Sequence, residues 1–173
     1  MALAVSLLLS ADLAGAVSQR WDRLADAGLS RSMLELGYAP HVTLAVFDRL
    51  DARVVAGALE DVLGRQSRFP VTLTGIATFG PGSGVCYAAL APSAELVRLH
   101  EAVLDAAGEI CRPHYQVGRW TPHCTLATGM ADIDLARAHE LLLPGWPLTG
   151  TFKAADLVEF VPIVDIKRWV LAG

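Results

Sequence analysis

The sequence is poor in charge, and in positive charge above all. Charged residues make up 18% of the chain, and 14 Lys and Arg stand against 18 Asp and Glu, which gives a formal net charge of -4. A protein that grips a long nucleic-acid backbone needs a broad cationic surface, so this composition argues against such a ligand. If the substrate is a nucleic acid, we expect a nucleotide or a short RNA end.

Cysteine is also scarce. The chain has three cysteines, Cys86, Cys111 and Cys124, an odd number without any Cys-x-x-Cys pair. This pattern argues against a disulfide framework and against a thiolate metal site, and it favours a reducing, cytoplasmic location. The glycine-rich stretch at residues 80–84 lacks the Gly-Lys-Ser/Thr ending of a phosphate-binding P-loop, so it predicts a flexible connection between strands.

The apolar run at residues 2–9 is too short to cross a membrane. A transmembrane helix needs about 20 apolar residues, and no Lys or Arg precedes this run as it would in a secretory signal. We expect a buried first strand there and no membrane partner. With 173 residues and 53% hydrophobic content, the chain is expected to form a single domain over residues 1–173 with a substantial core.

What the chain does contain is an internal repeat. The segment YAPHVTLA at residues 38–45 returns about half the chain later as WTPHCTLA at residues 120–127. Two flanking pairs keep the same order: SADL and SAEL upstream, at residues 10–13 and 93–96, and FPVT and WPLT downstream, at residues 69–72 and 146–149. Three anchors in one order indicate two repeated units, at roughly residues 1–84 and 85–173.

Each unit is predicted to run strand, helix, strand, helix, strand. In the first unit we expect a helix that Ser10 caps and that ends near Gly28, a second helix from its cap Asp51 to Gly64, and a strand at residues 71–77. In the second unit we expect strands at residues 85–90, 123–128 and 157–161, helices at residues 94–107 and 134–143, and a last strand at residues 167–171. The predicted fold is α+β: a bilobal duplicated unit with two antiparallel sheets lining a central cleft, helices outside, and pseudo-two-fold symmetry.

Both copies of the central motif place a histidine and a threonine on one face of a strand. Because side chains alternate along a strand, His41 and Thr43 point the same way, about 7 Å apart, as do His123 and Thr125. The symmetry then brings two imidazoles and two hydroxyls to one cleft. An imidazole with an ordinary pKa of about 6.5 can accept a proton while its partner donates one. The hydroxyls can bind non-bridging phosphate oxygens without Mg²⁺.

These two His-x-Thr-hydrophobic motifs, HVTL at residues 41–44 and HCTL at residues 123–126, resemble those of the two-histidine (2H) phosphoesterase superfamily and its bacterial 2′-5′ RNA ligase-like branch. The resemblance implies a bilobal fold and hydrolysis of 2′,3′-cyclic or 1″,2″-cyclic phosphates, or the making and breaking of 2′-5′ linkages. It implies His41 and His123 as the acid/base pair, Thr43 and Thr125 as phosphate ligands, and no cofactor. Which histidine is the acid stays open.

Four further residues are candidates for substrate contact. Tyr38 and Trp120 hold the same place, three residues before each histidine, where they can stack on a base or ribose or pack in the core or at the rim. Arg119 can pair with a phosphate or be an ordinary surface residue. Tyr115 lies in the loop that leads to the second motif.

Two other classes of function stay open. One is a binding module that holds a nucleotide or RNA end without turnover, although the intact histidines and threonines count against it. The other is a metal-assisted hydrolase in which His114 joins His41 and His123, because two imidazoles are fewer than the ligands of a stable zinc site. Under the leading hypothesis we expect no metal and no protein partner.

Overall fold

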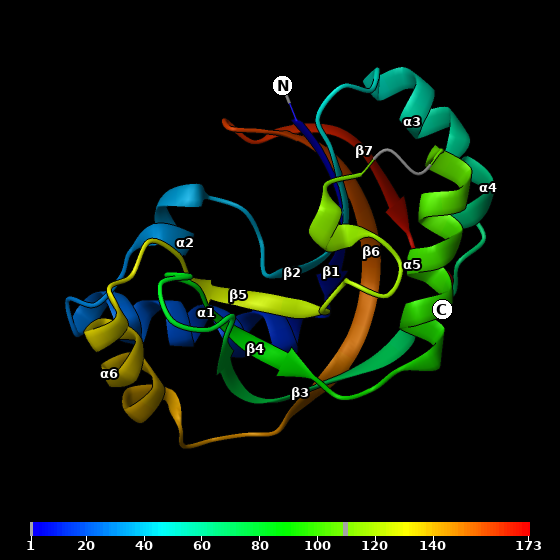
Figure 1. Cartoon of the computed structure of the whole chain (residues 1–173). Coiled ribbons are helices and arrows are strands. Elements are labelled where there is room, and N and C mark those ends of the chain that lie inside the picture. Colours follow the sequence, from blue (N-terminus) through cyan, green and yellow to red (C-terminus); the bar gives the residue numbers. More distant parts are fainter. Residues whose placement is uncertain (1, 109–110) are drawn as a thin grey trace.

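The computed structural model describes residues 2–108 and 111–173, in which helices alternate with antiparallel strands (Figure 1). The strands are β1 (Ala2–Leu9), β2 (His41–Phe47), β3 (Phe69–Thr78), β4 (Cys86–Leu90), β5 (His123–Ala127), β6 (Leu148–Phe160) and β7 (Val164–Val170). The helices are α1 (Ala11–Asp26), α2 (Ser32–Leu36), α3 (Ala52–Ala58), α4 (Glu60–Leu63), α5 (Ala94–Ala107) and α6 (Asp132–Leu142), with a 3-10 turn, η1 (Pro113–Tyr115). The α+β class is confirmed.

The expectation of two separate sheets is wrong. The described strands form one antiparallel sheet in the order β2-β1-β6-β3-β4-β5, and β7 pairs with β6. The long strand β6 makes the sheet continuous, because its residues 148–152 pair with β3 and its later residues pair with β1 and β7. The sequence motifs indicate two halves, but hydrogen bonding is not interrupted between them.

The two sequence repeats exchange elements. Strand β3, from the first repeat, pairs with β4 of the second, whereas β6 of the second repeat pairs with β1 of the first. Helices are exchanged as well, since α1 packs against β5 and β6 while α5 packs against β2. Figure 1 shows α1, α2 and α6 gathered at one end of the sheet and α3, α4 and α5 at the other. Each half of the sheet is therefore built from both repeats.

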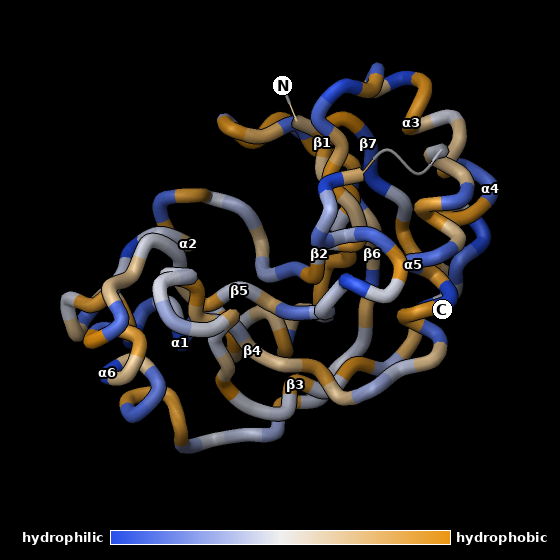
Figure 2. Tube along the Cα trace, in the orientation of Figure 1, coloured by the Kyte–Doolittle hydropathy of each residue, from blue (hydrophilic) through white to orange (hydrophobic). Residues whose placement is uncertain are grey.

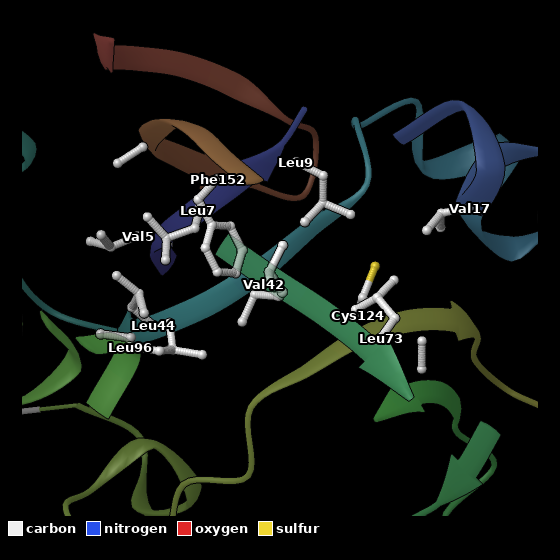
Figure 3. Packing of buried hydrophobic residues seen from close by; sticks show 14 of the residues in the cluster. Val5, Leu7, Leu9, Val17, Val42, Leu44, Leu73, Leu96, Cys124 and Phe152 are labelled. Atoms are coloured by element: carbon white, nitrogen blue, oxygen red, sulfur yellow. The ribbon is translucent and has the colours of Figure 1, made fainter. Parts of the chain in front are cut away.

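Strand β1 is buried on both faces of the sheet. Its odd-numbered residues join the main core with α1 and α5: Leu3, Val5, Leu7 and Leu9. Figure 3 shows this packing around Phe152 and Val42. Its even-numbered residues are also buried and lie on the opposite face: Ala2, Ala4, Ser6 and Leu8. Burial of both faces explains why the strand is a continuous apolar run instead of an alternating one, and three of the four even-numbered residues are small.

The helix predicted between Asp51 and Gly64 is two helices, α3 and α4, which meet at Leu59. Asp51 caps α3 as predicted, through hydrogen bonds from two backbone N–H groups. Ser10 is the N-cap residue of α1 as predicted, but its hydroxyl makes no capping hydrogen bond and instead accepts from the Thr151 N–H of β6 at 3.3 Å. The strand expected at residues 157–161 is the end of the longer β6, and α2 was not predicted.

Hydrophobic and hydrophilic positions alternate along α5 and α6 (Figure 2). Several large apolar side chains are exposed, among them Val161 at 74% in the turn between β6 and β7. Within residues 2–108 and 111–173, no helix combines the length and the apolar character that a membrane span requires.

Candidate active site

The two histidine-bearing strands meet although they stand at opposite ends of the strand order. Strands β2 and β5 are the end strands, yet they contact each other, so the curved sheet brings its two ends together. Burial raises the pKa of the Cys124 thiol in β5, and the nearby backbone of His41 in β2 lowers it. Each strand begins with its histidine and carries its threonine two residues later. The structure thus brings both motifs to one place.

Both imidazoles are held in the same way. Nδ1 of His41 lies 2.8 Å from the carbonyl oxygen of Ala39, and Nδ1 of His123 lies 2.7 Å from that of Thr121. Because a carbonyl oxygen only accepts, the neutral ring carries its proton on Nδ1 and keeps Nε2 as the basic nitrogen. In both copies the acceptor stands two residues before the histidine. The matched bonds fix the same tautomer on both sides.

Burial lowers the pKa of both histidines below the ordinary value. For His41, burial has the largest effect; the hydrogen bond to Ala39 raises the pKa, the charge of His123 lowers it, and the charge of Asp156 raises it. For His123, burial again dominates, the hydrogen bond to Thr121 raises the pKa, and the charge of His114 lowers it. A charged His123 therefore disfavours a second charge on His41, and a charged His114 disfavours one on His123.

The threonines stand where their strands bulge. Thr43 pairs with Ser6, but the next pair skips Leu44; Thr125 pairs with Tyr87, and the next pair skips Leu126. A bulge of one residue bends a strand and re-aims its side chains, and bulges are frequent beside functional sites. The same irregularity at the same place in both repeats gives both threonines one local geometry.

Two tryptophans hold the threonine backbones from the opposite repeat. The indole N–H of Trp120 donates to the carbonyl oxygen of Thr43, and that of Trp21 to the carbonyl oxygen of Thr125, each at 3.1 Å. Trp120 also stacks on the buried ring of His100, with 4.0 Å between ring centroids. Trp120 therefore packs against His100 and donates to the Thr43 carbonyl, and its contact with a base stays a prediction.

The other three candidate contacts are placed differently. Tyr38 and Tyr115 are nearly buried beside β2. The Tyr38 ring lies 4.6 Å from that of His41 between centroids. Burial raises the pKa of Tyr115, and the nearby Thr43 side chain lowers it. Arg119 is exposed on the loop before β5. The structure brings the two tyrosines to the site and leaves Arg119 on the surface.

A row of polar side chains crosses the sheet from Thr43. Register puts Thr43 beside Ser6, Ser6 beside Asp156, and Asp156 beside Arg168. The Thr43 and Ser6 hydroxyls lie 3.4 Å apart, and Arg168 donates two hydrogen bonds of 2.7 Å to the Asp156 carboxylate, which is 2% exposed. The Tyr38 hydroxyl donates to the same carboxylate at 3.4 Å. Tyr38 is thus linked to an ion pair whose carboxylate is buried and whose guanidinium is half exposed, and Thr43 lies in the same row.

His123 lies among aromatic rings instead. Its ring centroid is 4.9 Å from that of Phe79 and 5.4 Å from that of Tyr87, and these two rings stack on each other at 4.4 Å. Tyr87 pairs with Thr125, and Ala77 pairs with Tyr87. By register, Tyr87 and Ala77 therefore occupy the places that Ser6 and Asp156 occupy beside Thr43.

Sequence reasoning missed Ser6 and Asp156 on one side and Phe79 and Tyr87 on the other. For the first two, the available signal was a lone polar residue at an inward position of an apolar strand, since such residues are rarely buried without a partner. For the two aromatics no local signal existed, because only strand register brings them to His123.

The described residues contain no group of three or more His, Cys, Asp or Glu side chains arranged to hold a metal ion. His114 is exposed beside Tyr115, and it does not complete a ligand set with His41 and His123.

The sequence as a whole matches one family. The model of the 2′-5′ RNA ligase superfamily matches residues 14–161. The chain belongs to this superfamily. Its resemblance to the 2H phosphoesterases is thereby confirmed. No curated protein sequence matched the chain.

Solved structures share the fold of this superfamily member. The crystal structure of E. coli LigT complexed with 3′-AMP has a TM-score of 0.68 and 22% identity, covering 99% of this chain and 98% of that one. The crystal structure of TT0787 from Thermus thermophilus has a TM-score of 0.67 and 18% identity, covering 100% and 99%. A crystal structure described as a phosphoesterase has a TM-score of 0.62 and 21% identity, covering 99% and 98%. At these identities the likeness concerns the fold.

Proposed function

We propose that the protein is a metal-independent phosphoesterase that hydrolyses 2′,3′-cyclic or related cyclic phosphates of a nucleotide or RNA end, or that acts on 2′-5′ phosphodiester linkages. One observation carries the proposal. His41 and His123, from the two contacting strands, have matched Nδ1 bonds to backbone carbonyls, so each keeps Nε2 as the nitrogen that can exchange a proton with substrate. Crystal structures of E. coli LigT complexed with 3′-AMP, ATP and NADP⁺ support a nucleotide or short RNA end as the ligand.

The chemistry needs one neutral and one charged imidazole. The neutral ring accepts a proton from water as the water oxygen attacks phosphorus, and the charged ring donates a proton to the ribose oxygen whose bond to phosphorus breaks. The cyclic ester becomes a monoester, and the two rings end with their protonation states exchanged. Proton exchange with solvent then restores them. Their mutual repulsion favours the singly protonated pair that this cycle requires.

Thr43 and Thr125 are proposed to bind the two non-bridging phosphate oxygens. A hydroxyl can donate a hydrogen bond to the charge that grows on these oxygens in the transition state. The bulge after each threonine and the indole bond to each threonine carbonyl would hold these donors in place before substrate arrives. Such preorganisation is the usual source of electrostatic catalysis.

The test is turnover of 2′,3′-cyclic AMP in the presence of EDTA, followed by phosphorus NMR, which identifies the monoester formed. His41→Ala and His123→Ala are each expected to lower kcat/KM at least about 100-fold, the usual contribution of a general acid or base. His139→Ala is the matched control, because this histidine is exposed on α6, and it should keep wild-type activity.

Other outcomes select the competing hypotheses. Activity that disappears in EDTA and returns with Zn²⁺ would identify a metal-assisted hydrolase. A wild-type protein that binds cyclic AMP but does not turn over this substrate or a 2′-5′-linked dinucleotide would be a binding module.

A further inference from the structure

His100 is a buried titratable residue that the proposed chemistry does not use. It lies in α5, the helix that packs against β2, and its exposed fraction is 2%. Ionisable side chains are rarely buried so completely without partners that satisfy them. The partners of this imidazole therefore indicate what it does.

The imidazole of His100 has two partners, and both lie in the segment that leads to β5. Its ring lies nearly parallel to the indole of Trp120, with 4.0 Å between ring centroids and 12° between planes. Its Nε2 lies 2.8 Å from the carbonyl oxygen of Tyr115, and because a carbonyl oxygen only accepts, Nε2 carries the proton. Burial lowers the pKa of His100, which favours the neutral ring, whereas the bond to Tyr115 and the charge of Glu101 raise it.

Both partners of His100 adjoin Thr43. The indole N–H of Trp120 donates to the Thr43 carbonyl oxygen at 3.1 Å. Tyr115 ends the 3-10 turn η1, which contacts β2, and it lines one cavity together with Thr43. One buried ring therefore holds two residues that lie beside the same proposed phosphate ligand.

The repeat shows that the helix does not need an imidazole at this place. Helices α1 and α5 begin directly after the matching residues Ser10 and Ser93, and their seventh residues are Val17 and His100. Val17 is fully buried in the main core. An apolar side chain is thus compatible with this helix position, and the packing of the helix alone does not explain the histidine.

The two indole bonds to the threonine carbonyls differ in what holds the tryptophan. Trp21 belongs to α1, so a helix fixes its backbone. Trp120 lies in the loop before β5, outside any helix or strand. Loop residues have more freedom of movement than helical ones, and contact with a ring fixed on a helix restricts it. His100 therefore gives Trp120 the support that Trp21 receives from its own helix.

We propose that His100 is a positioning residue for Thr43. Its ring orients the Trp120 indole and the Tyr115 backbone, and these two hold Thr43 where its hydroxyl can meet a non-bridging phosphate oxygen. The effect on catalysis rests on the proposed function, whereas the support of the Thr43 backbone can be tested without it.

The first test follows the indole N–H groups by NMR and needs no substrate. In His100→Leu, the Trp120 Nε1–H should exchange with solvent at least about fivefold faster, because its hydrogen bond to Thr43 is weakened. The Trp21 Nε1–H donates at the same distance of 3.1 Å and should be unchanged. Trp120→Phe and Trp21→Phe assign the two signals. Equal changes in both signals, or no change in either, would overturn the inference.

The second test is a double-mutant cycle on the turnover of 2′,3′-cyclic AMP. His100→Leu should lower kcat about fivefold, which lies within the coupling range of side chains in one network. In a Thr43→Val background the same change should lower kcat less than about twofold, because the hydroxyl that it positions is gone. In a Thr125→Val background the full loss should remain. Equal losses in all three backgrounds would contradict a role through Thr43.

Two further variants separate positioning from general stability. His100→Gln, whose amide can donate to the Tyr115 carbonyl and lie against the indole, should recover most of the kcat that His100→Leu loses; no recovery would count against the inference. Val103→Ala is the matched control, because Val103 is fully buried one turn farther along α5 and has no polar group. It should lower the free energy of unfolding in urea and leave kcat unchanged, and a matching fall of kcat would overturn the inference.

The two tests fail separately. If the Trp120 signal alone responds to His100→Leu but wild-type protein turns over no cyclic phosphate, the support of Thr43 by His100 stands and the proposed catalytic function fails. If wild-type protein is active and His100→Leu keeps full kcat, the proposed function stands and the positioning role fails.

Discussion

The His41 half and the His123 half of the site share a backbone and differ in their side chains. Each half has an Nδ1 bond to a carbonyl two residues upstream, a bulge directly after the threonine, and an indole N–H on the threonine carbonyl. Beyond these features the halves diverge. Ser6 and Asp156 stand beside Thr43, whereas Tyr87 and Ala77 stand beside Thr125.

The shared backbone features suit the proposed acid/base chemistry, whereas the differing side chains suit substrate recognition. The proposed chemistry needs two positioned imidazoles and two donors, and both halves keep the backbone features that position them. The proposed substrate would suit an asymmetric site, because a nucleoside 2′,3′-cyclic phosphate has its base on one side of the phosphate only. At one matched register position the small Ser6 lines a cavity beside His41, whereas the large Tyr87 packs against His123.

Among the positions at which the two halves differ, Asp156 is expected to have the largest effect on stability. Asp156→Ala leaves Tyr38 and Arg168 without their shared partner, and we expect the free energy of unfolding to fall by about 2 kcal/mol. This is less than the roughly 3–5 kcal/mol for a fully buried pair, because Arg168 is 53% exposed and can be solvated. Urea denaturation measures the change. Asp48→Ala removes a similar bidentate Arg contact at the surface and should have a much smaller effect. Equal losses for the two variants would contradict a special role for the buried carboxylate.

The two tryptophan hydrogen bonds test whether the features shared by the two halves matter for activity. Trp120→Phe and Trp21→Phe each remove one indole N–H from a threonine carbonyl and keep most of the packing, so each should lower the free energy of unfolding by about 1 kcal/mol. Each should also lower kcat severalfold, because a threonine donor loses its support. Trp146→Phe is the control, since its indole donates to Leu142 away from the site; it should lower stability alike and leave kcat unchanged. A matching fall of kcat in the control would show a global effect.

Local signals predicted much of the fold. Strand β1 and helix α5 have the expected bounds, because an apolar run, the Ser93 cap and Gly108 act over a few neighbouring residues. The exchange of β3 and β6 between repeats was not predictable in this way. It depends on which strand pairs with which, and the pairing partners lie far apart in the sequence.

The candidate site shows the same division. The sequence pointed to four candidate site residues because the same His-x-Thr motif occurs in both repeats: His41, Thr43, His123 and Thr125. The cavity that Ser6, His41 and Thr43 help to line was not found, since it follows from the register that places Ser6 beside Thr43. Trp120 shows what position in the sequence leaves open: the motif allowed both base stacking and packing within the protein, and the contact with His100 of α5 follows only from the tertiary structure.

The smallest expected effect is the change of kcat/KM with pH, which depends on His41 and His123 together. Burial lowers the pKa of both His41 and His123, so we expect the singly protonated pair to be most populated below the ordinary histidine pKa of about 6.5. The charge of one ring further lowers the pKa of the other, which separates the two apparent values. We therefore expect kcat/KM, measured between about pH 4.5 and 8.5, to pass through a maximum below about pH 6.5 and to fall severalfold toward neutral pH. A maximum at or above about pH 7.5 would contradict the sign of both shifts, and it would mean that substrate-free imidazoles are stabilised in their charged form.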